Sequence, residues 1–284
     1  MVQACRSRWA KLALHVWSAL ALREQVPIDF EVYLPKPWTD DPERRRRARI
    51  PESVTFKTKI ELALDMITRA VEDKVPGKNV LADAFYGRSS AFRNTVRVFG
   101  LDYAVAVDAV TQVWLMDAIG RRRGDAIGAQ NLGVQAGIGA FRRLTWRDGT
   151  KAKHKLASRF LFRRVKPAGD DGTEPASREP MWLVIEWPDG EPKPTKFFLT
   201  TLRRRMSKKQ IVRTIKERWK IERSYRELKG ELGLDHYEGR SFVGWHHHIS
   251  VVLCCYAFVV AERVRHFPPS ARRARKADSV ARAA

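Results

Sequence analysis

The sequence has few cysteines and few acidic residues for its length. The three cysteines, Cys5, Cys254 and Cys255, form no CxxC pair, and adjacent cysteines rarely bond to each other. The sequence therefore predicts neither a disulfide framework nor a zinc site. Asp and Glu number 32 against 54 Lys and Arg, which gives a formal net charge of +22. Such an excess favours a polyanionic partner, because each phosphate that is neutralised releases condensed counterions.

Processing signals and long apolar runs are also missing. The apolar run at residues 9–22 contains Lys11 and His15 and lacks a small-residue cleavage site, which argues against a signal peptide. Residues 249–261 are apolar, but this run of about 13 residues is shorter than the roughly 20 that a membrane span needs. The sequence predicts a buried helix there, and a soluble, cytoplasmic protein without a membrane partner.

The order of the predicted elements indicates an α/β fold. Strands are predicted at residues 28–34, 80–83 and 103–107. Helices are predicted at residues 59–73 and 89–99 from the spacing of their apolar residues. The alternation of strand, helix and strand predicts a sheet with at least some parallel pairing.

Two segments without clear periodicity are predicted to be loops. Residues 38–51 are polar and contain the run Arg44–Arg47, which is typical of a solvated connector. Residues 118–139 contain six glycines, and none of this segment matches a phosphate-binding GxxxxGK[ST] sequence. The pattern then turns to β, with four strands predicted at residues 144–147, 158–165, 182–187 and 195–200.

A helix predicted from Ser207, its N-cap, to about residue 232 carries a charged stripe. At 100° per residue, Arg218, Glu222 and Lys229 fall within roughly 40° of one another on this helix. A carboxylate flanked by two cations is suited to hold a metal ion beside phosphates. Ion pairs on a solvated helix give the same pattern, so the stripe leaves both interpretations open. A last helix is predicted at roughly residues 242–266.

Asp83 is a second carboxylate in a position that suits a metal ligand. It ends the predicted strand at residues 80–83, and carboxylates in this position bind metal ions in α/β folds. A capping or turn role is the alternative. Together with Glu222, Asp83 forms half of a candidate two-metal site, since attack on a phosphodiester uses carboxylates that hold two Mg²⁺ ions roughly 3.5–4 Å apart.

These residues resemble those of DDE-type insertion-sequence transposases, which have a ribonuclease-H-like core. The stretch from Val80 to Gly87 is similar to the strand that bears the family's second catalytic Asp. The family's signature helix reads Tyr, two residues, Arg, three residues, Glu, six residues, Lys. This chain matches the last three positions in spacing, with Ile215 at the Tyr position. The similarity extends over about residues 12–265.

The resemblance implies an α/β fold with a ribonuclease-H-like mixed sheet, flanking helices and a β-rich insertion. It divides the chain into an N-terminal core part at residues 1–139, the insertion at 140–203, a helical part with the Glu helix at 204–267, and a basic disordered tail at 268–284. The family's first catalytic Asp has no counterpart, because no Asp precedes Asp29, which matches the third strand. The chain therefore resembles an N-terminally truncated copy.

The function implied by the resemblance is DNA transposition, in which an insertion sequence is cut and joined to a target. Asp83 and Glu222 would be the catalytic metal ligands for Mg²⁺ or Mn²⁺, two ions in an intact member, and Arg218, Trp219 and Lys229 would bind DNA. The implied partners are double-stranded DNA of the element ends and of the target. A homodimer on DNA and a location at the prokaryotic nucleoid are further expectations.

Three alternatives remain open at this point. Without the first Asp, the copy is expected to be inactive, and it could instead be a non-catalytic, basic DNA-binding remnant that interferes with an intact transposase. A ribonuclease-H-like exonuclease is another alternative, although such enzymes usually lack the Arg-Glu-Lys helix and the insertion. Asp108 is either a substitute metal ligand or an ordinary loop carboxylate.

Overall fold

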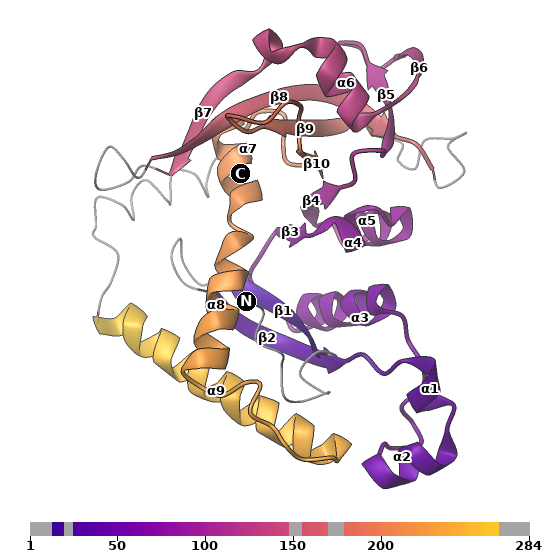
Figure 1. The fold of residues 1–284 in the computed structure, drawn as a ribbon, viewed down its shortest axis with the longest axis vertical. Coiled ribbons are helices and arrows are strands. Elements are labelled where there is room, and N and C mark those ends of the chain that lie inside the picture. Colours follow the sequence, from indigo (N-terminus) through magenta and orange to yellow (C-terminus); the bar gives the residue numbers. More distant parts are fainter. Residues whose placement is uncertain (1–12, 20–24, 148–154, 170–178, 267–284) are drawn as a thin grey trace. The chain divides into compact units, whose positions relative to one another are not determined.

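The chain forms two compact units, each with its own sheet. The structure is a computed structural model that describes residues 13–19, 25–147, 155–169 and 179–266. Unit 1 combines Met1–Gly77 with Trp219–Ala283, and unit 2 consists of Lys78–Arg218 (Figure 1). The fold is mixed α/β with a mixed sheet flanked by helices, as predicted. The predicted tail at residues 268–284 lies outside the described residues.

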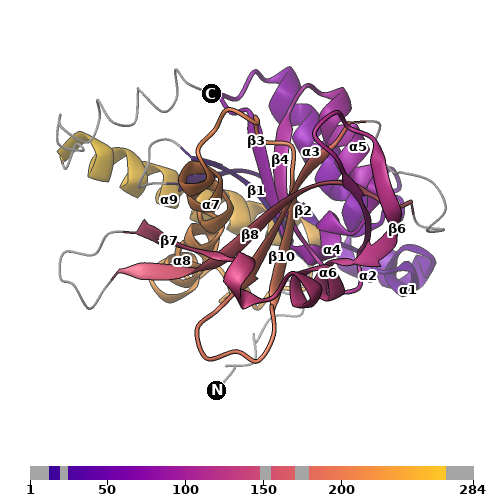
Figure 2. The same ribbon diagram turned by 90° about the horizontal axis from the view of Figure 1, so that it is seen from above.

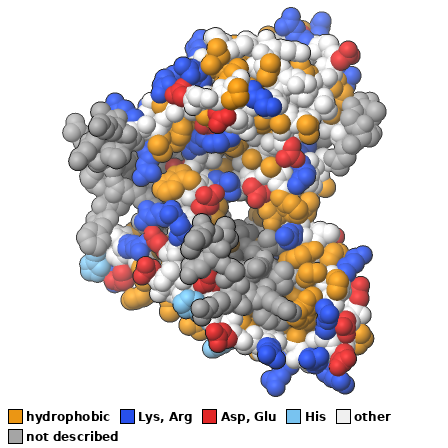
Figure 3. All heavy atoms as spheres, in the orientation of Figure 1, with side chains coloured by type: hydrophobic (Ala, Val, Ile, Leu, Met, Phe, Trp, Pro, Cys, Tyr) orange, Lys and Arg blue, Asp and Glu red, His pale blue; other side chains and the backbone are white. Residues whose placement is uncertain are grey.

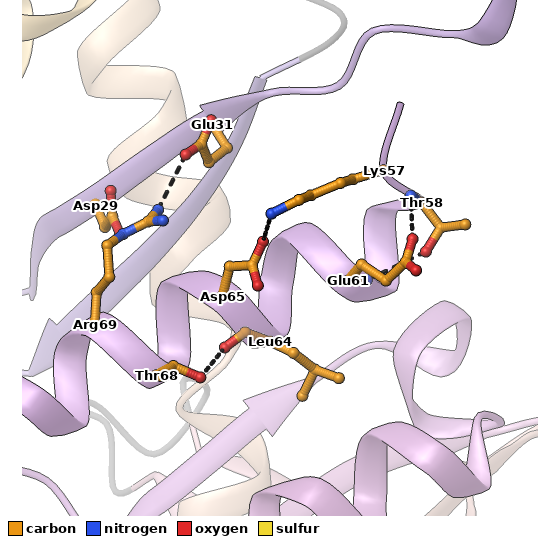
Figure 4. Close-up of polar contacts among 9 residues, drawn as sticks. All are labelled: Asp29, Glu31, Lys57, Thr58, Glu61, Leu64, Asp65, Thr68 and Arg69. Carbon is orange, nitrogen blue, oxygen red and sulfur yellow. Dashed lines mark hydrogen bonds and ion pairs between the residues drawn. The ribbon is translucent and has the colours of Figure 1, made fainter. Parts of the chain in front are cut away.

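A β-hairpin is the centre of unit 1. Strand β1 (Ala13–Ala19) pairs antiparallel with β2 (Gln25–Val32), which confirms the strand predicted at residues 28–34. Successive side chains of a strand point to opposite faces. On β2, Phe30 packs on the ring of Trp245 in α9 (Phe242–His266), with 5.6 Å between ring centroids. Asp29 and Glu31 point the other way, toward α3 (Lys59–Glu72) (Figure 4). The hairpin thus lies between two helices.

Helix α9 has the bounds that its apolar pattern predicted. Trp245, Ile249, Val252, Leu253, Tyr256 and Val260 are its buried residues, and they pack against Leu228 of α8 (Trp219–Gly230) and against β2. By length and composition alone, α9 would also be able to cross a membrane. Core helices of soluble proteins meet the same criterion, and 33% of its most apolar window is buried within the protein.

The prediction of a polar loop at residues 38–51 is wrong. This segment forms two short helices, α1 (Lys36–Thr39) and α2 (Pro42–Ala48). Asp41 caps α2 by accepting a hydrogen bond from the backbone N–H of Arg44, with a proline at the first helical position. Ala48 and Ile50 are buried in the core of unit 1. The polar run of arginines gave no sign that Ala48 and Ile50 are buried, because their apolar partners come only from the tertiary structure.

Unit 2 is built on one sheet of eight strands. Their order is β3-β4-β10-β9-β8-β5-β6, with β7 paired to β8, and only β3 and β4 are parallel (Figures 1 and 2). The predicted strands at residues 80–83 and 103–107 and the four in the β-rich region are confirmed. The strands are β3 (Asn79–Ala82), β4 (Asp102–Val107), β5 (Gln112–Met116), β6 (Arg122–Gly128), β7 (Arg142–Arg147), β8 (Leu156–Pro167), β9 (Met181–Trp187) and β10 (Lys196–Thr200).

Helices cover both faces of this sheet. Helix α7 (Lys208–Lys216) packs Ile211, Val212 and Ile215 on the face that includes Val184 of β9. The next residue of β9, Ile185, points to the opposite face and contacts α6 (Ala129–Ala136) at Gly133. A Cβ atom at Gly133 would lie 2.9 Å from Pro194 and 3.3 Å from Ile185, so glycine permits this close packing.

The prediction of a flexible loop at residues 118–139 is therefore wrong, because this segment forms β6 and α6. Its glycines serve turns and close packing: Gly120, Gly124 and Gly137 have positive φ angles, which glycine adopts without steric cost. Strands β5 and β6 join the same sheet as β7–β10. Six glycines with little apolar periodicity gave no signal for a half-buried strand and helix.

The single helix predicted from Ser207 to about residue 232 is two helices. The capping box of Ser207 and Gln210 begins α7 as predicted. Helix α7 ends at Lys216, residues 217–218 form a turn, and α8 begins at Trp219. No glycine or proline marks this break. It separates two apolar faces that are buried in different units, which sequence periodicity does not distinguish.

Candidate metal and DNA site

Asp83 caps a short helix and keeps one carboxylate oxygen available. It follows β3 and is the N-cap of α4 (Ala84–Gly87), where its Oδ1 atom accepts hydrogen bonds from the N–H groups of Phe85 at 3.0 Å and Tyr86 at 3.4 Å. The residue is exposed, and its Oδ2 atom accepts no hydrogen bond from the described part of the chain. The capping alternative is thus real, yet it leaves half of the carboxylate for a ligand.

Gly87 fixes the turn that follows Asp83. A Cβ atom built there would lie 1.9 Å from the carbonyl oxygen of Ala106 in β4, so α4 can approach the strand only with glycine at this position.

Burial, and to a smaller extent the negative charge of Asp83, raise the pKa of Tyr86 to about 12. The phenol next to Asp83 therefore stays protonated at neutral pH and is a hydrogen-bond donor.

Asp108 lies at the same edge of the sheet as Asp83. Strands β3 and β4 are parallel, with Ala82 opposite Val105, so both strands end toward one edge. Asp108 follows β4 directly. By this register Asp83 is level with Ala106, so Asp108 lies two residues further along, at roughly 3.3 Å per residue. A guanidinium nitrogen of Arg88 lies 3.8 Å from the Asp108 carboxylate. The Arg88 and Asp108 side chains are 60% and 43% exposed, so this weak pair leaves Asp108 available as a substitute ligand.

Asp29, the other acid near the N-terminus, is already fully engaged. Its Oδ1 atom accepts a hydrogen bond from the N–H of Phe30 at 2.7 Å, and its Oδ2 atom lies 2.8 Å from Nε of Arg69 (Figure 4). The same guanidinium lies 3.1 Å from Glu31. Burial alone would lower the pKa of Arg69, but these two carboxylates raise it on balance. This arrangement is a structural ion-pair network within unit 1.

Glu222 and Lys229 occupy one exposed face of α8. They are seven residues apart, which brings them to the same side of the helix at a spacing of roughly 10 Å along its axis. Trp219, at the start of α8, is half-buried. The opposite side of α8 buries Ser224 and Leu228 in unit 1. The helix thus presents its carboxylate in the first turn and its lysine in the last, as the signature predicts for those two residues.

A polar network fixes α8 to α9. Glu227 accepts hydrogen bonds from Arg223 at 3.0 Å and from Arg263 of α9 at 2.9 Å, and the hydroxyl of Tyr256 donates to it at 3.3 Å. Burial alone would raise the pKa of Glu227, but the two arginines lower it on balance. A charged network that no local sequence pattern indicates therefore holds helix α8, which carries Glu222, against α9.

The predicted site residues divide between the two units. Asp83 and Arg218 belong to unit 2, whereas Trp219, Glu222 and Lys229 belong to unit 1. Arg218 lies in the turn before α8 and not on the helix, which corrects the continuous charged stripe. A metal site shared by Asp83 and Glu222 stays a prediction, and so do the DNA contacts of Arg218, Trp219 and Lys229.

The mixed α/β fold, with a mixed sheet flanked by helices, is consistent with a ribonuclease-H-like core. Residues 14–153, just under half of the chain, match the family model described as "DDE superfamily endonuclease". This match supports a DDE-type, transposase-like protein. A search of curated proteins found no match. The matched segment includes Asp83 and Asp108 but ends before α7, so the assignment of Glu222 depends on the signature spacing.

The chemistry of the two carboxylates fits the divalent metals that DDE superfamily enzymes generally use. Mg²⁺ and Mn²⁺ prefer oxygen ligands, and carboxylates are the usual protein ligands for them. Asp83 offers an exposed oxygen at the end of a strand, and Glu222 is exposed on a helix. The described residues contain no group of three or more His, Cys, Asp or Glu side chains that could hold a metal ion.

Proposed function

We propose that this protein acts on DNA as a DDE-type transposase of an insertion sequence, with Asp83 and Glu222 as the ligands of a divalent metal ion. The observation that carries this proposal is the family match over residues 14–153, together with the open oxygen of Asp83 at the end of β3. Bound Mg²⁺ or Mn²⁺ would supply an activated water and neutralise charge on the scissile phosphate. Arg218, Trp219 and Lys229 would hold the DNA strands, at the element ends and in the target.

The residues around Asp83 have distinct tasks in this proposal. The hydrogen bonds from the N–H groups of Phe85 and Tyr86 hold one oxygen of Asp83 and orient the other outward. The protonated phenol of Tyr86 does not compete with Asp83 as an anion. Glu227 and its arginines hold α8 so that Glu222 keeps a fixed direction. These residues position the two carboxylates, and no side-chain nucleophile is needed because the metal-activated water would attack the phosphate.

A metal-mapping experiment tests whether Asp83 and Glu222 share an ion. With Fe²⁺ in place of Mg²⁺, peroxide and ascorbate generate hydroxyl radicals at the metal site, and these cut the backbone nearby. We expect fragments that end near residue 83 and near residue 222 in the same sample. Asp83→Asn should remove both sets of cuts, and excess Mg²⁺ should suppress them. Cuts near only one of the two carboxylates would contradict a shared site.

The second candidate function is a non-catalytic DNA-binding protein that interferes with an intact transposase. Two observations favour it. The net charge is +22, and Asp83 and Glu222 are the only acids of the sequence that match the family's metal-ligand positions. On this basis we expect the 284-residue chain to bind duplex DNA but to cut it slowly or not at all. Mg²⁺- or Mn²⁺-dependent nicking that Asp83→Ala abolishes would contradict this expectation and would make Asp108 the next acid to substitute.

A further inference from the structure

A basic cavity lies in unit 2, within the β-rich part of the sheet. Its volume is about 410 Å³, and eight residues from β7, β8, α7 and the segment before β7 line it. Three of them, Arg142, Arg163 and Lys208, are cations, and none of the eight is acidic. The other five are Ala140, Leu144, Phe160, Leu161 and Phe162. The site needs nothing from unit 1.

The cavity lies where the edge of β8 has no neighbouring strand. On this edge β7 pairs with β8 as far as Phe160, which is opposite Arg142, and β5 begins to pair at Val165. Residues 161–164 of β8 are thus left uncovered between the two strands, although β9 pairs with them on the other edge. The guanidinium of Arg163 folds back along this edge and donates to the carbonyl oxygen of Phe162 at 3.2 Å.

Within the described part of the chain, the three cations differ from neighbouring arginines in having no carboxylate partner. Arg143 follows Arg142 on β7, and Arg159 precedes Phe160 on β8. Both arginines bind the carboxylate of Asp189. In contrast, no acid among the described residues forms an ion pair with Arg142, Arg163 or Lys208. Positive charges gathered around one cavity repel each other, and an anion bound between them offsets that repulsion. The natural occupant is therefore an anion that accepts several hydrogen bonds.

The aromatic rings of the cavity do not favour recognition of a nucleic-acid base. Phe160 and Phe162 are 2% and 7% exposed, and the ammonium group of Lys208 lies 5.4 Å from the ring centroid of Phe162. Because the rings are buried in the core and Lys208 lies over Phe162, neither ring offers a face for stacking. The cavity is suited to an oxyanion and not to a planar base.

From these observations we infer that the cavity of Arg142, Arg163 and Lys208 binds a backbone phosphate of duplex DNA, without reading its sequence. This inference depends on the proposed function for the identity of the polyanion. It adds a DNA contact on the β-rich sheet, made by residues other than those of the candidate metal site. Free inorganic phosphate has the same oxyanion chemistry and is the alternative source of the ligand.

The test compares two double variants of equal charge loss. Arg142→Gln/Arg163→Gln removes two cations of the cavity, and the matched control Arg143→Gln/Arg159→Gln removes two cations of the same strands that bind Asp189. A labelled duplex of arbitrary sequence is titrated by fluorescence anisotropy at several salt concentrations. We expect the cavity variant to weaken binding about tenfold and to lower the slope of log K against log salt by about one, the value for one lost phosphate contact. The control should change affinity by about twofold or less.

A second matched pair guards against misfolding of the double variant. Lys208→Gln should weaken duplex binding more than Lys209→Gln, which removes an exposed lysine that does not line the cavity. Thermal unfolding should be alike for all variants that are compared. Equal losses in the cavity variants and their controls would overturn the inference, because the effect would then be that of net charge alone.

Titration with inorganic phosphate separates the two sources of the anion. We expect phosphate to compete with the duplex only weakly, at millimolar concentrations. Micromolar binding of phosphate that requires Arg142 and Arg163, with an unchanged salt slope for DNA, would overturn the inference in favour of a free-anion site. The readout is binding and not cleavage. Absence of metal-dependent cleavage by the wild-type protein therefore counts only against the proposed function. Unchanged DNA binding by Arg142→Gln/Arg163→Gln counts only against a phosphate site in the cavity.

Discussion

Two carboxylates of unit 2 show opposite uses of an acidic side chain. Glu186 of β9 is 3% exposed, and its Oε2 atom lies 2.5 Å from Nζ of Lys216 at the end of α7. The ammonium group also lies 4.7 Å from the ring centroid of Trp146 and within about 6 Å of two phenylalanine rings. Asp83, in contrast, is exposed, and only one of its oxygens is engaged.

The difference separates acids that are paired in the core from acids that keep an oxygen available for a ligand. A buried, paired carboxylate such as Glu186 has its charge neutralised within the core, so it specifies structure. Burial lowers the pKa of Lys216, while Glu186 partly offsets that effect. An exposed carboxylate such as Asp83, with one oxygen held by backbone N–H groups, keeps its other oxygen as an acceptor for a ligand. Asp83 and Asp29 differ in the same way, because Asp29 has both oxygens occupied.

The largest expected effect comes from breaking the buried pair. Lys216→Met should destabilise unit 2 by about 3–5 kcal/mol, because it leaves Glu186 charged and buried without a partner. The double variant Glu186→Leu/Lys216→Met should regain most of that loss, since it removes both charges together. Urea unfolding of the four proteins in this double-mutant cycle measures the coupling. A double variant as unstable as the sum of the single variants would show that the pair is not neutralised as described.

A smaller effect is expected on the Asp83 side, at the glycine that fixes its turn. Gly87→Ala should cost about 2–3 kcal/mol, because the new Cβ atom clashes with the carbonyl oxygen of Ala106 and forces a backbone shift. Gly139→Ala is the control in the same unit, since nothing lies within 4 Å of its Cβ position. Thermal unfolding compares the two, and equal shifts of the melting temperature would contradict the close approach of α4 to β4.

Glu227 offers an intermediate case, a half-buried acid with two arginines. Because its pKa is lowered in the folded state, its contribution to stability is present above the ordinary value of 4.5 and is lost as pH falls through the folded pKa. Glu227→Gln should cost about 1–2 kcal/mol at pH 7 and progressively less below about pH 4.5. Glu231→Gln, at an exposed position of the next turn, is the control. A difference between wild type and Glu227→Gln that stays constant with pH would contradict the network.

The smallest change in stability is expected at Asp83 itself. Asp83→Asn retains an N-cap oxygen, so stability should change by less than about 0.5 kcal/mol, whereas Asp83→Ala should cost up to about 1 kcal/mol. Both variants should lose Mn²⁺ binding, measured by calorimetry. Asp83→Asn thus separates the cap from the metal ligand. Retained Mn²⁺ affinity in this variant would assign the metal to other acids and leave Asp83 a cap alone.

Much of unit 2 could be predicted from the sequence because its signals are local. The strands of the β-rich region alternate or run apolar between turn residues, and Ser207 with Gln210 forms the expected capping box. Asp83 could be proposed as a metal ligand from the sequence because a carboxylate that ends an apolar strand is a local pattern. Arg142 and Arg163 were missed, because nothing in a strand sequence tells a cation that lines a cavity from one that is solvated or paired.

The sequence by itself determined the α/β class, the helices at residues 59–73 and 242–266, the basic character and the spacing of Arg218, Glu222 and Lys229. These follow from periodicity, composition and distance along the chain, which are local or additive properties. Only the tertiary structure decided that the helix after Ser207 breaks at residues 217–218, that residues 38–51 and 118–139 are ordered elements, and which acids are neutralised. The reason is that burial and pairing depend on partners far away in the sequence. Glu186 meets Lys216 across 30 residues and Asp29 meets Arg69 across 40, and no local pattern records either contact.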